Sequence, residues 1–428
     1  METVSLINYL LAVLFFVCYS YQLLYIFIPF IRKSKPCKNT KFHKYAVLIA
    51  ARNEEAVITH LIESIKNQNY PSELIDIFVV ADNCTDNTAS LARAAGARVW
   101  ERFNRMKAGK GYAIDFLLKR IEEAYPDRPF DGYFIFDADN LLDEDYINEM
   151  NRLFSEGHRI VTSYRNSKNY GSNWISAGTS LWFLRESQYL SRSRMLFGTS
   201  CAVSGTGFLF HRDIIEKSGG WSFFTLTEDI EFSVYNIIKG EKIAYCESAV
   251  LYDEQPVRFS QSWRQRMRWT KGNIQVCRKY GTELIKSIFK NRSFSSFDMT
   301  MSIFAAFTLT AVSVAVNLFG FVYGLLLGRN LMIILVSIWK SIVNAYLMFF
   351  AIGLITTISE WKKIFASPAE KIVYAFTFPI FMFTYIPITI AAIFKKVEWK
   401  QIEHSKSITL KEIRMIKSKK STSEPAGY

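Results

Sequence analysis

The 428-residue sequence predicts an α/β domain that is built on a parallel sheet and combined with helices that span a membrane. Short runs of large apolar residues alternate with helical patterns between positions 44 and 296, which is typical of a sheet covered by helices. Uncharged runs at positions 3–31 and 299–328 each exceed the roughly 20 residues that a spanning helix needs. Acidic residues directly follow several predicted strands, and open α/β sheets bind their ligands at that edge.

The apolar segments predict an integral membrane protein. Positions 372–394 are also uncharged, and positions 331–359 carry one charged residue, Lys340. Basic residues follow the first apolar segment at positions 32, 33, 35, 38, 41 and 44, whereas Glu2 precedes it. Cytoplasmic loops are enriched in lysine and arginine, so we expect a plasma-membrane protein whose middle domain is cytoplasmic.

The net charge of +13 has the same explanation, because the basic residues cluster beside apolar segments and can meet anionic headgroups there. This placement disfavours a nucleic-acid partner. The six cysteines show no spacing typical of metal ligands, so no structural zinc site is expected.

The sequence divides into five parts. These are an N-terminal transmembrane helix with a basic linker (1–43), a cytosolic α/β domain (44–257), interfacial helices (258–296), a C-terminal transmembrane region (297–394) and a basic tail (395–428). Three full crossings after residue 296 would place the tail outside, whereas its many lysines favour the cytosol. Pro379 and Pro387 interrupt the last apolar run, so we expect it not to cross simply, or to be helped by a break near Lys340.

The first half of the middle domain reads as alternating strands and helices. Predicted strands at 45–51 and 75–81 end in Asn53-Glu54 and Asp82, and a third short strand follows at 97–100. This series, with carboxylates at strand ends, is typical of a nucleotide-binding half-domain. Neither GxGxxG nor a P-loop is present, which disfavours a dinucleotide and a P-loop NTPase. Glu54 can alternatively stabilise the start of the next helix.

Two further stretches suggest phosphate and metal chemistry. Lys110 stands between glycines at a predicted helix start, which favours a phosphate, although a solvated basic turn is the alternative. Asp137-Ala138-Asp139 ends the buried strand at 132–136. In an extended chain the side chains of residues i and i+2 point to the same side, so both carboxylates could bind one Mg²⁺ or Mn²⁺ ion. The alternative is a polar strand end that turns into a loop.

Three more motifs follow in the order Ser204-Gly205-Thr206, Thr227-Glu228-Asp229 and Gln265-x-x-Arg268-Trp269. Together with the aspartates at strand ends, this order resembles the processive family 2 glycosyltransferases, the group of cellulose, chitin and hyaluronan synthases. The resemblance covers residues 45–272 and extends to the flanking apolar segments. It implies a GT-A type domain that transfers a sugar from a UDP-sugar with inversion.

The resemblance also implies roles for single residues. The nucleotide-sugar ligands would be Asn53, Glu54, Asp82, Lys110, Asp137, Gln265 and Arg268. Asp139 and Asp137 would hold the metal, and Asp229, beside Glu228, would be the catalytic base. Trp269, Ser204, Gly205 and Thr206 would contact the acceptor. Simpler interpretations are an acidic helix start for Glu228 and Asp229, and a basic aromatic helix on the membrane surface for residues 263–269.

We therefore expect a membrane enzyme that elongates a β-linked polysaccharide, with UDP-glucose as the favoured donor, and passes the product across the bilayer. Alternatives are a polymer of N-acetylglucosamine or a hyaluronan-type product. Transfer of one sugar to a polyprenyl phosphate is disfavoured by Gln265-x-x-Arg268-Trp269. A transporter is disfavoured because the spans show no inverted repeat. Residues 397–400 loosely resemble the gating segment of these synthases.

Overall fold

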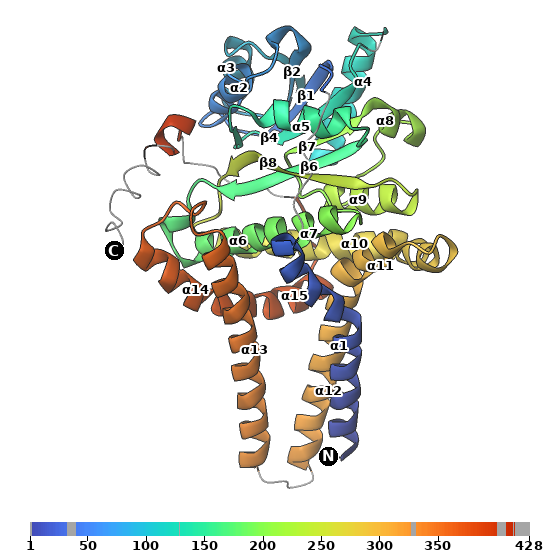
Figure 1. Ribbon diagram of the computed structural model, residues 1–428, viewed down its shortest axis with the longest axis vertical. Helices are drawn as coiled ribbons and strands as arrows, with labels where there is room; N and C mark the ends of the chain where they lie inside the picture. The colour runs from blue at the N-terminus through green and yellow to red at the C-terminus, as the bar shows by residue number, and fades with distance from the viewer. Residues whose placement is uncertain are drawn as a thin grey trace.

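The computed structural model describes residues 2–31, 40–127, 129–326, 331–399, 408–413 and 415. Its α/β domain lies at one end, a layer of helices lies beneath it, and three long helices project from that layer (Figure 1). The predicted class, an α/β domain combined with apolar helices, is confirmed.

The described residues form an eight-stranded sheet in the order β3-β2-β1-β4-β7-β6-β8-β5. The strands are β1 (Tyr45–Ala51), β2 (Ile75–Asp82), β3 (Arg98–Arg102), β4 (Gly132–Asp137), β5 (Leu141–Leu142), β6 (Ile160–Ser167), β7 (Phe208–His211) and β8 (Ile243–Asp253). Strands β3, β2, β1 and β4 are parallel, and β7 runs antiparallel to β4 and β6. Ala50 pairs with Asp137 and Ala51 with Ala81, so these strands end at one edge.

Alternation along the strands supplies two hydrophobic cores. Ala46 and Leu48 of β1 face one core, and Val47 and Ile49 face the other. The first core is covered by α4 (Lys110–Ala124) and α9 (Glu228–Ile238), and the second by α2 (Ile58–Lys66) and α5 (Tyr146–Ser155). Helices α3 (Thr88–Ala94) and α8 (Arg212–Ser218) and the 3₁₀ turns Ser72–Leu74 and Tyr170–Ser172 complete the domain.

The layer beneath the sheet consists of α6 (Trp174–Arg185), α7 (Arg192–Phe197), α10 (Phe259–Lys290), α11 (Phe294–Thr300), α14 (Pro368–Phe383) and α15 (Tyr385–Phe394). Two π-helical segments, Glu186–Ser191 and Met301–Ala305, connect α6 to α7 and α11 to α12. Helix α14 packs closely on α6, where a Cβ atom at Gly178 would stand 2.7 Å from Cδ2 of Phe381.

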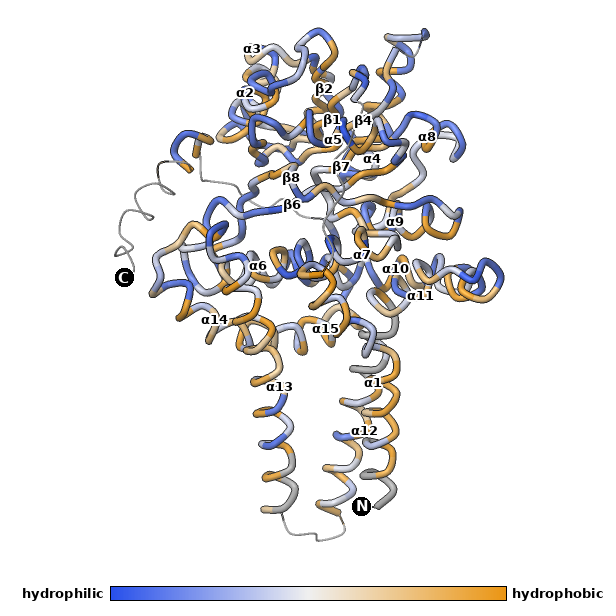
Figure 2. Tube along the Cα trace, in the orientation of Figure 1, coloured by the Kyte–Doolittle hydropathy of each residue, from blue (hydrophilic) through white to orange (hydrophobic). Residues whose placement is uncertain are grey.

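The projecting helices are α1 (Glu2–Ile31), α12 (Ala306–Leu326) and α13 (Leu331–Ser359). By length and hydropathy, Tyr9–Ile31, Ile338–Ser359 and Pro368–Phe394 could each cross a membrane, and Val312–Leu326 is a shorter apolar helix. Hydrophobic residues predominate along α1 (Figure 2), and the side chains of Leu24 and Phe27 are exposed. Exposed apolar side chains of this kind require a lipid or protein environment.

The last apolar run does not lie beside the other long helices. Helices α14 and α15 cross the ends of α1, α12 and α13, and the chain bends between them at Thr384 (Figure 1). The interruption expected from the prolines is therefore present as a bend, and the path of this run relative to the membrane stays a prediction. Helix α13 is continuous through Lys340, so the alternative of a break at that residue is wrong. Ile413 of the tail is buried against Leu141 and Tyr252 of the sheet, which places this part of the tail on the side of the α/β domain.

A buried ion pair anchors the first long helix to the layer. Asp298 accepts hydrogen bonds from Nε of Arg194 at 2.7 Å, from Tyr21 at 2.8 Å and from Tyr25 at 2.9 Å. Buried charges persist when they are paired and hydrogen-bonded, and both charges here are. This contact fixes α1 relative to α7 and α11.

Candidate active site

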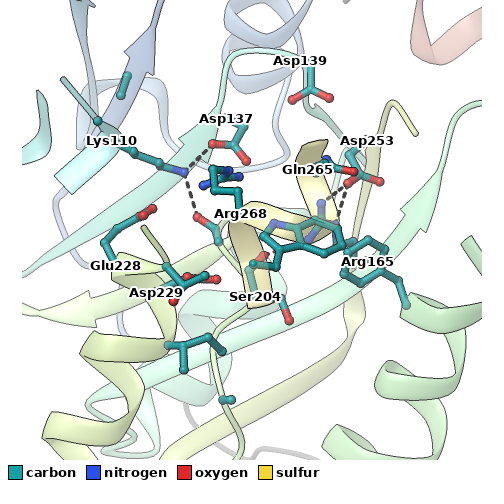
Figure 3. A pocket seen from close by; sticks show the side chains of 18 of the residues that line it. Lys110, Asp137, Asp139, Arg165, Ser204, Glu228, Asp229, Asp253, Gln265 and Arg268 are labelled. Atoms are coloured by element: carbon teal, nitrogen blue, oxygen red, sulfur yellow. Dashed lines mark hydrogen bonds and ion pairs between the residues drawn. The ribbon is translucent and has the colours of Figure 1, made fainter. Parts of the chain in front are cut away.

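A cavity of about 360 Å³ opens at the carboxyl ends of the strands, between the sheet and the helical layer. Figure 3 shows side chains from the strand ends, α9 and α10 converging on it. Most of the residues predicted as functional line it: Glu54, Asp82, Lys110, Asp137, Asp139, Ser204, Gly205, Glu228, Asp229, Gln265, Arg268 and Trp269.

Asn53 and Thr206 are not among the lining residues. Asn53 has φ +52° and joins two loops, because its Oδ1 accepts a hydrogen bond from the backbone of Thr85 at 2.7 Å. Thr206 is buried, and its Oγ1 accepts from the backbone N–H of Asp137 at 2.9 Å. Both residues lie behind the cavity wall, and their contacts with a ligand stay predictions.

Asp82 lies at the nucleotide end predicted for the cavity. Its carboxylate forms an ion pair with Arg102 and accepts a hydrogen bond from Nδ2 of Asn83 at 2.9 Å. Burial raises the pKa of Asp82, and the neighbouring guanidinium opposes that shift. A fixed carboxylate of this kind can accept a hydrogen bond from a base N–H.

Lys110 connects two parts of the cavity. It is the first residue of α4, and its Nζ donates to Asp137 and, at 2.8 Å, to the carbonyl oxygen of Gly205 (Figure 3). Strand β4 ends at Asp137, so the alternation that was expected to put Asp137 and Asp139 on one side of an extended chain does not hold, although both residues line the cavity. Asp139 lies in the following turn, where it accepts from the backbone of Glu254 at 3.0 Å.

The donor set of the cavity fits a hard divalent cation. Nine carboxylate side chains and five arginine or lysine side chains line it, so a bound diphosphate would meet an excess of negative charge. Among the described residues, no three His, Cys, Asp or Glu side chains form a ready cage for a metal. Mg²⁺ commonly binds through one or two carboxylates plus substrate phosphates, which is the arrangement that Asp137 and Asp139 offer.

Glu228 and Asp229 begin α9 and face the cavity. Burial, and then repulsion from Asp229, raise the pKa of Glu228 to about 7, and burial also raises the pKa of Asp229. A carboxylate with a raised pKa is a better proton acceptor. The backbone of Gly205 lies beside Asp229, since a Cβ atom there would be in ordinary van der Waals contact with Oδ2 of Asp229, at 3.5 Å.

Helix α10 contributes Gln265, Arg268 and Trp269 to the cavity, and their spacing places them on one helical face. Arg268 donates from Nη1 to the carbonyl oxygen of Leu226 at 2.9 Å. Arg266 lies elsewhere on the helix, fully buried, and donates to Oγ1 of Thr384 at 2.6 Å. A helix that only coats a membrane surface would leave such residues at the surface, so that interpretation does not account for this helix.

The structure adds cavity residues that the sequence analysis missed. Arg165 donates from Nε to Asp253 at 2.6 Å and from Nη1 to the carbonyl oxygen of Ser204 at 2.9 Å. Asp253 is the last residue of β8, so the rule that identified Asp82 could have identified it, whereas Arg165 lies inside β6 and is not marked by that rule. Glu186 and Trp399 also line the cavity, and the guanidinium of Arg52 lies 5.0 Å from the Trp399 ring. Trp399 belongs to the segment 397–400, whose loose resemblance to a gating segment was noted in the sequence, whereas no local pattern indicates Glu186.

Comparison with known proteins agrees with this geometry. Residues 43–272 match the model of the family described as "Glycosyltransferase like family 2". A beta-monoglucosyldiacylglycerol synthase of Nostoc is 25% identical over 63% of this chain and 57% of that protein. A poly-beta-1,6-N-acetyl-D-glucosamine synthase of Staphylococcus epidermidis is 23% identical over 54% of both chains. The chain thus spans little more than half the length of these relatives.

A solved structure shares the fold. The mannosyltransferase PcManGT from Pyrobaculum calidifontis, in complex with GDP-Man and Mn²⁺, aligns over 90% of this chain and 98% of its own with a TM-score of 0.55 and 15% identity. At that identity the likeness establishes the fold alone. With the family match, it shows that this chain belongs to glycosyltransferase family 2 and is a sugar-transferring enzyme with a GT-A-like fold.

Proposed function

We propose that this enzyme transfers a sugar from a UDP-sugar to a saccharide at a membrane and so elongates a β-linked polysaccharide, with glucose as the favoured sugar. The observation that carries the proposal is the loop 204–206. Thr206 and Gly205 accept hydrogen bonds from Asp137 and Lys110, which are proposed donor ligands, and Gly205 also lies beside Asp229, the proposed base. Ser204, a proposed acceptor contact, directly precedes them. One rigid backbone segment therefore sets the distance between the two substrates.

The donor would lie along the strand ends. Glu54 and Asp82, with Asn53 behind them, would hold the uridine, and Lys110 and Arg268 would complement the diphosphate. Gln265 lines the same cavity, and its buried Oε1 has no hydrogen-bond partner within the described part of the chain. Buried polar atoms are normally satisfied, so this oxygen is available to a substrate donor group.

Asp139 and Asp137 would hold Mg²⁺ or Mn²⁺, which neutralises charge on the departing diphosphate. The protein's own contribution to that step is the fixed cation of Lys110, which is held between Asp137 and Gly205. Preorganised charge of this kind usually makes one of the greatest contributions to the rate of an enzymatic reaction.

Asp229 would remove the proton from the acceptor hydroxyl as that oxygen attacks the anomeric carbon from the face opposite to UDP. The pKa of Glu228 is raised to about 7, so near neutral pH the two carboxyl groups of Glu228 and Asp229 would together hold about one proton. The pair would then still carry negative charge to accept the acceptor's proton. Trp269 would place the acceptor sugar against its ring, with Ser204 and Gly205 beneath. This arrangement inverts the anomeric configuration, because attack and departure occur on opposite faces.

The long apolar helices support a membrane location, with the α/β domain on the cytosolic side as the basic residues after α1 indicate. We include passage of the product across the bilayer in the proposal. A polymer with many hydroxyl groups needs a polar path, because such groups cannot cross bare lipid.

A test uses the full chain in nanodiscs with radiolabelled UDP-glucose and UDP-N-acetylglucosamine in separate reactions. We expect divalent-dependent UDP release and a labelled product that a linkage-specific β-glucanase digests. A labelled product that resists the glucanase but is digested by a hydrolase for N-acetylglucosamine polymers would show that the transferred sugar is N-acetylglucosamine and not glucose. Absence of UDP release with either donor would refute the proposal.

A second candidate, transfer of one sugar to a lipid hydroxyl, is favoured by the apolar residues Leu190, Met299 and Ile303 among those that line the cavity. The Nostoc relative carries that kind of activity in its name. Chloroform extraction separates the two products, because a glycosylated lipid enters the organic phase and a polysaccharide does not.

A further inference from the structure

Glu186 is a cavity residue to which neither the sequence motifs nor the proposed mechanism assigns a role. It begins the π-helical segment between α6 and α7, and its Oε1 accepts a hydrogen bond from Oγ of Ser204 at 2.9 Å. Within the described part of the chain, Ser204 is the hydrogen-bond donor to this carboxylate, so Oε2 can accept from a ligand. π-Helical turns are rare and occur frequently at functional sites.

The loop 204–206 fixes which end of the cavity Glu186 occupies. Thr206 contacts Asp137 on the donor side, the backbone of Gly205 lies beside Asp229, and Ser204 contacts Glu186. Consecutive residues of one loop therefore run from the donor, past the base, to Glu186. The acceptor must reach the base from the side opposite to UDP, which is the side of Glu186.

The surroundings of Glu186 match the chemistry of a sugar ring. Trp182 and Phe183 precede it by four and three residues, which places all three on one helical face, and all three line the cavity. The Phe183 ring packs edge-on against Trp269, with ring centroids 5.9 Å apart. Sugar rings offer apolar C–H faces to aromatic rings and hydroxyl groups to carboxylate oxygens, which accept hydrogen bonds.

We propose that Glu186 binds a hydroxyl group of the acceptor in the sugar unit next to the one at Trp269, so that the site takes a saccharide of at least two units. This inference rests on the proposed function, because it assigns a second acceptor subsite to the same cavity. A lipid chain in that position would place hydrocarbon against a carboxylate and gain no hydrogen bond.

The experiment compares Glu186→Ala and Glu186→Gln with wild type in the full chain, with Glu73→Gln as a matched control at an exposed position. Initial rates of UDP release from UDP-glucose are measured against cellotetraose concentration, and also without added acceptor. The same series is run with UDP-N-acetylglucosamine and chitotetraose. The acceptor-free rate reports folding and donor binding, so it separates a structural defect from an acceptor defect.

We expect Glu186→Ala to raise the KM for the tetrasaccharide by about 10-fold or more, the usual scale for a lost hydrogen bond to a charged group, without changing the acceptor-free rate or the KM for the donor. Glu186→Gln should have a smaller effect, because its amide oxygen still accepts. An unchanged KM for the tetrasaccharide in Glu186→Ala would overturn the inference alone. Glycosylation of dioleoylglycerol by the wild type, with no stimulation of UDP release by either tetrasaccharide, would overturn it as well. Wild-type protein without UDP release would overturn the proposed function and the inference together.

Discussion

Replacing Glu228 with glutamine should stabilise the folded enzyme at alkaline pH and leave its stability at acidic pH unchanged. Glu228 is 7% exposed and stands beside Asp229, and these two conditions raise its pKa to about 7 from an ordinary value of 4.5. A difference of this size corresponds to about 3 kcal/mol, at about 1.36 kcal/mol for each pKa unit. Glutamine has the same shape and carries no charge to bury.

The sign follows from proton linkage. The folded protein holds the proton of Glu228 more tightly than the unfolded chain does, so low pH favours folding. That advantage is complete below about pH 4.5 and is lost as the pH rises through about 7. Wild type therefore carries the full cost at pH 8, and Glu228→Gln does not.

The assay is thermal unfolding in one detergent at fixed scan rate, at pH 5 and pH 8, with Glu73→Gln as the exposed control. We expect the apparent Tm of Glu228→Gln to exceed that of wild type by several degrees at pH 8 and to match it at pH 5. Equal differences at both pH values would refute the reasoning, because they would show that Glu228 does not change its charge in that interval.

Three further predictions concern the proposed chemistry and the helix that carries Trp269. Asp229→Asn should lower turnover by about 10²-fold or more, the usual scale for a general base, while calorimetry finds UDP-sugar binding retained; parallel loss of binding would make the residue a ligand or a structural group. Chelation should abolish UDP release and Mn²⁺ or Mg²⁺ should restore it; full activity in excess chelator would exclude a metal. Asp139→Asn should reduce activity with little loss of Tm, because its amide oxygen can still accept the hydrogen bond from the backbone of Glu254. Gly272→Ala should lower both Tm and activity, because its Cβ would stand 2.8 Å from the backbone nitrogen of Thr227, next to Glu228. Gly281→Ala on the same helix meets nothing within 4 Å and should raise Tm slightly through helix propensity, so equal behaviour of the two variants would contradict the packing argument.

Sequence patterns predicted the parts of the site that local rules control. A short run of apolar residues predicts a strand, and the strands of a parallel sheet end at one edge. Asp82 and Asp137 could therefore be predicted to lie near one another from the sequence alone. The spacing of Gln265, Arg268 and Trp269 predicts one helical face in the same way. These predictions need no knowledge of how distant segments pack.

Other parts depend on packing that no short pattern contains. Arg165 follows an irregularity between Ser163 and Tyr164, where β8 carries extra residues opposite β6. Bulges of this kind redirect side chains, and their position depends on both strands. The direction of the Asp139 side chain could not be predicted either. Alternation gives a side chain's direction only within a strand, and β4 ends before this residue. The bend at Thr384 was indicated by proline, whereas its contact with Arg266 was not.

The loop 204–206 shows why a weak motif can be central to a site. Its contacts with Lys110 and Arg165 are made by carbonyl oxygens, which every residue possesses, so the identity of the side chains carries no record of them. The sequence does, however, show glycines at the positions where the backbone of this loop packs closely. Gly205 has φ +79°, and the next glycine, Gly207, has φ +65° and lies where a Cβ atom would stand 2.7 Å from Oγ of Ser163. Other residues rarely adopt these angles, and Gly207 in addition has no room for a Cβ atom. The two glycines place the backbone beside β6 and Asp229, and in the proposed mechanism this position would let one loop set the separation of donor and acceptor.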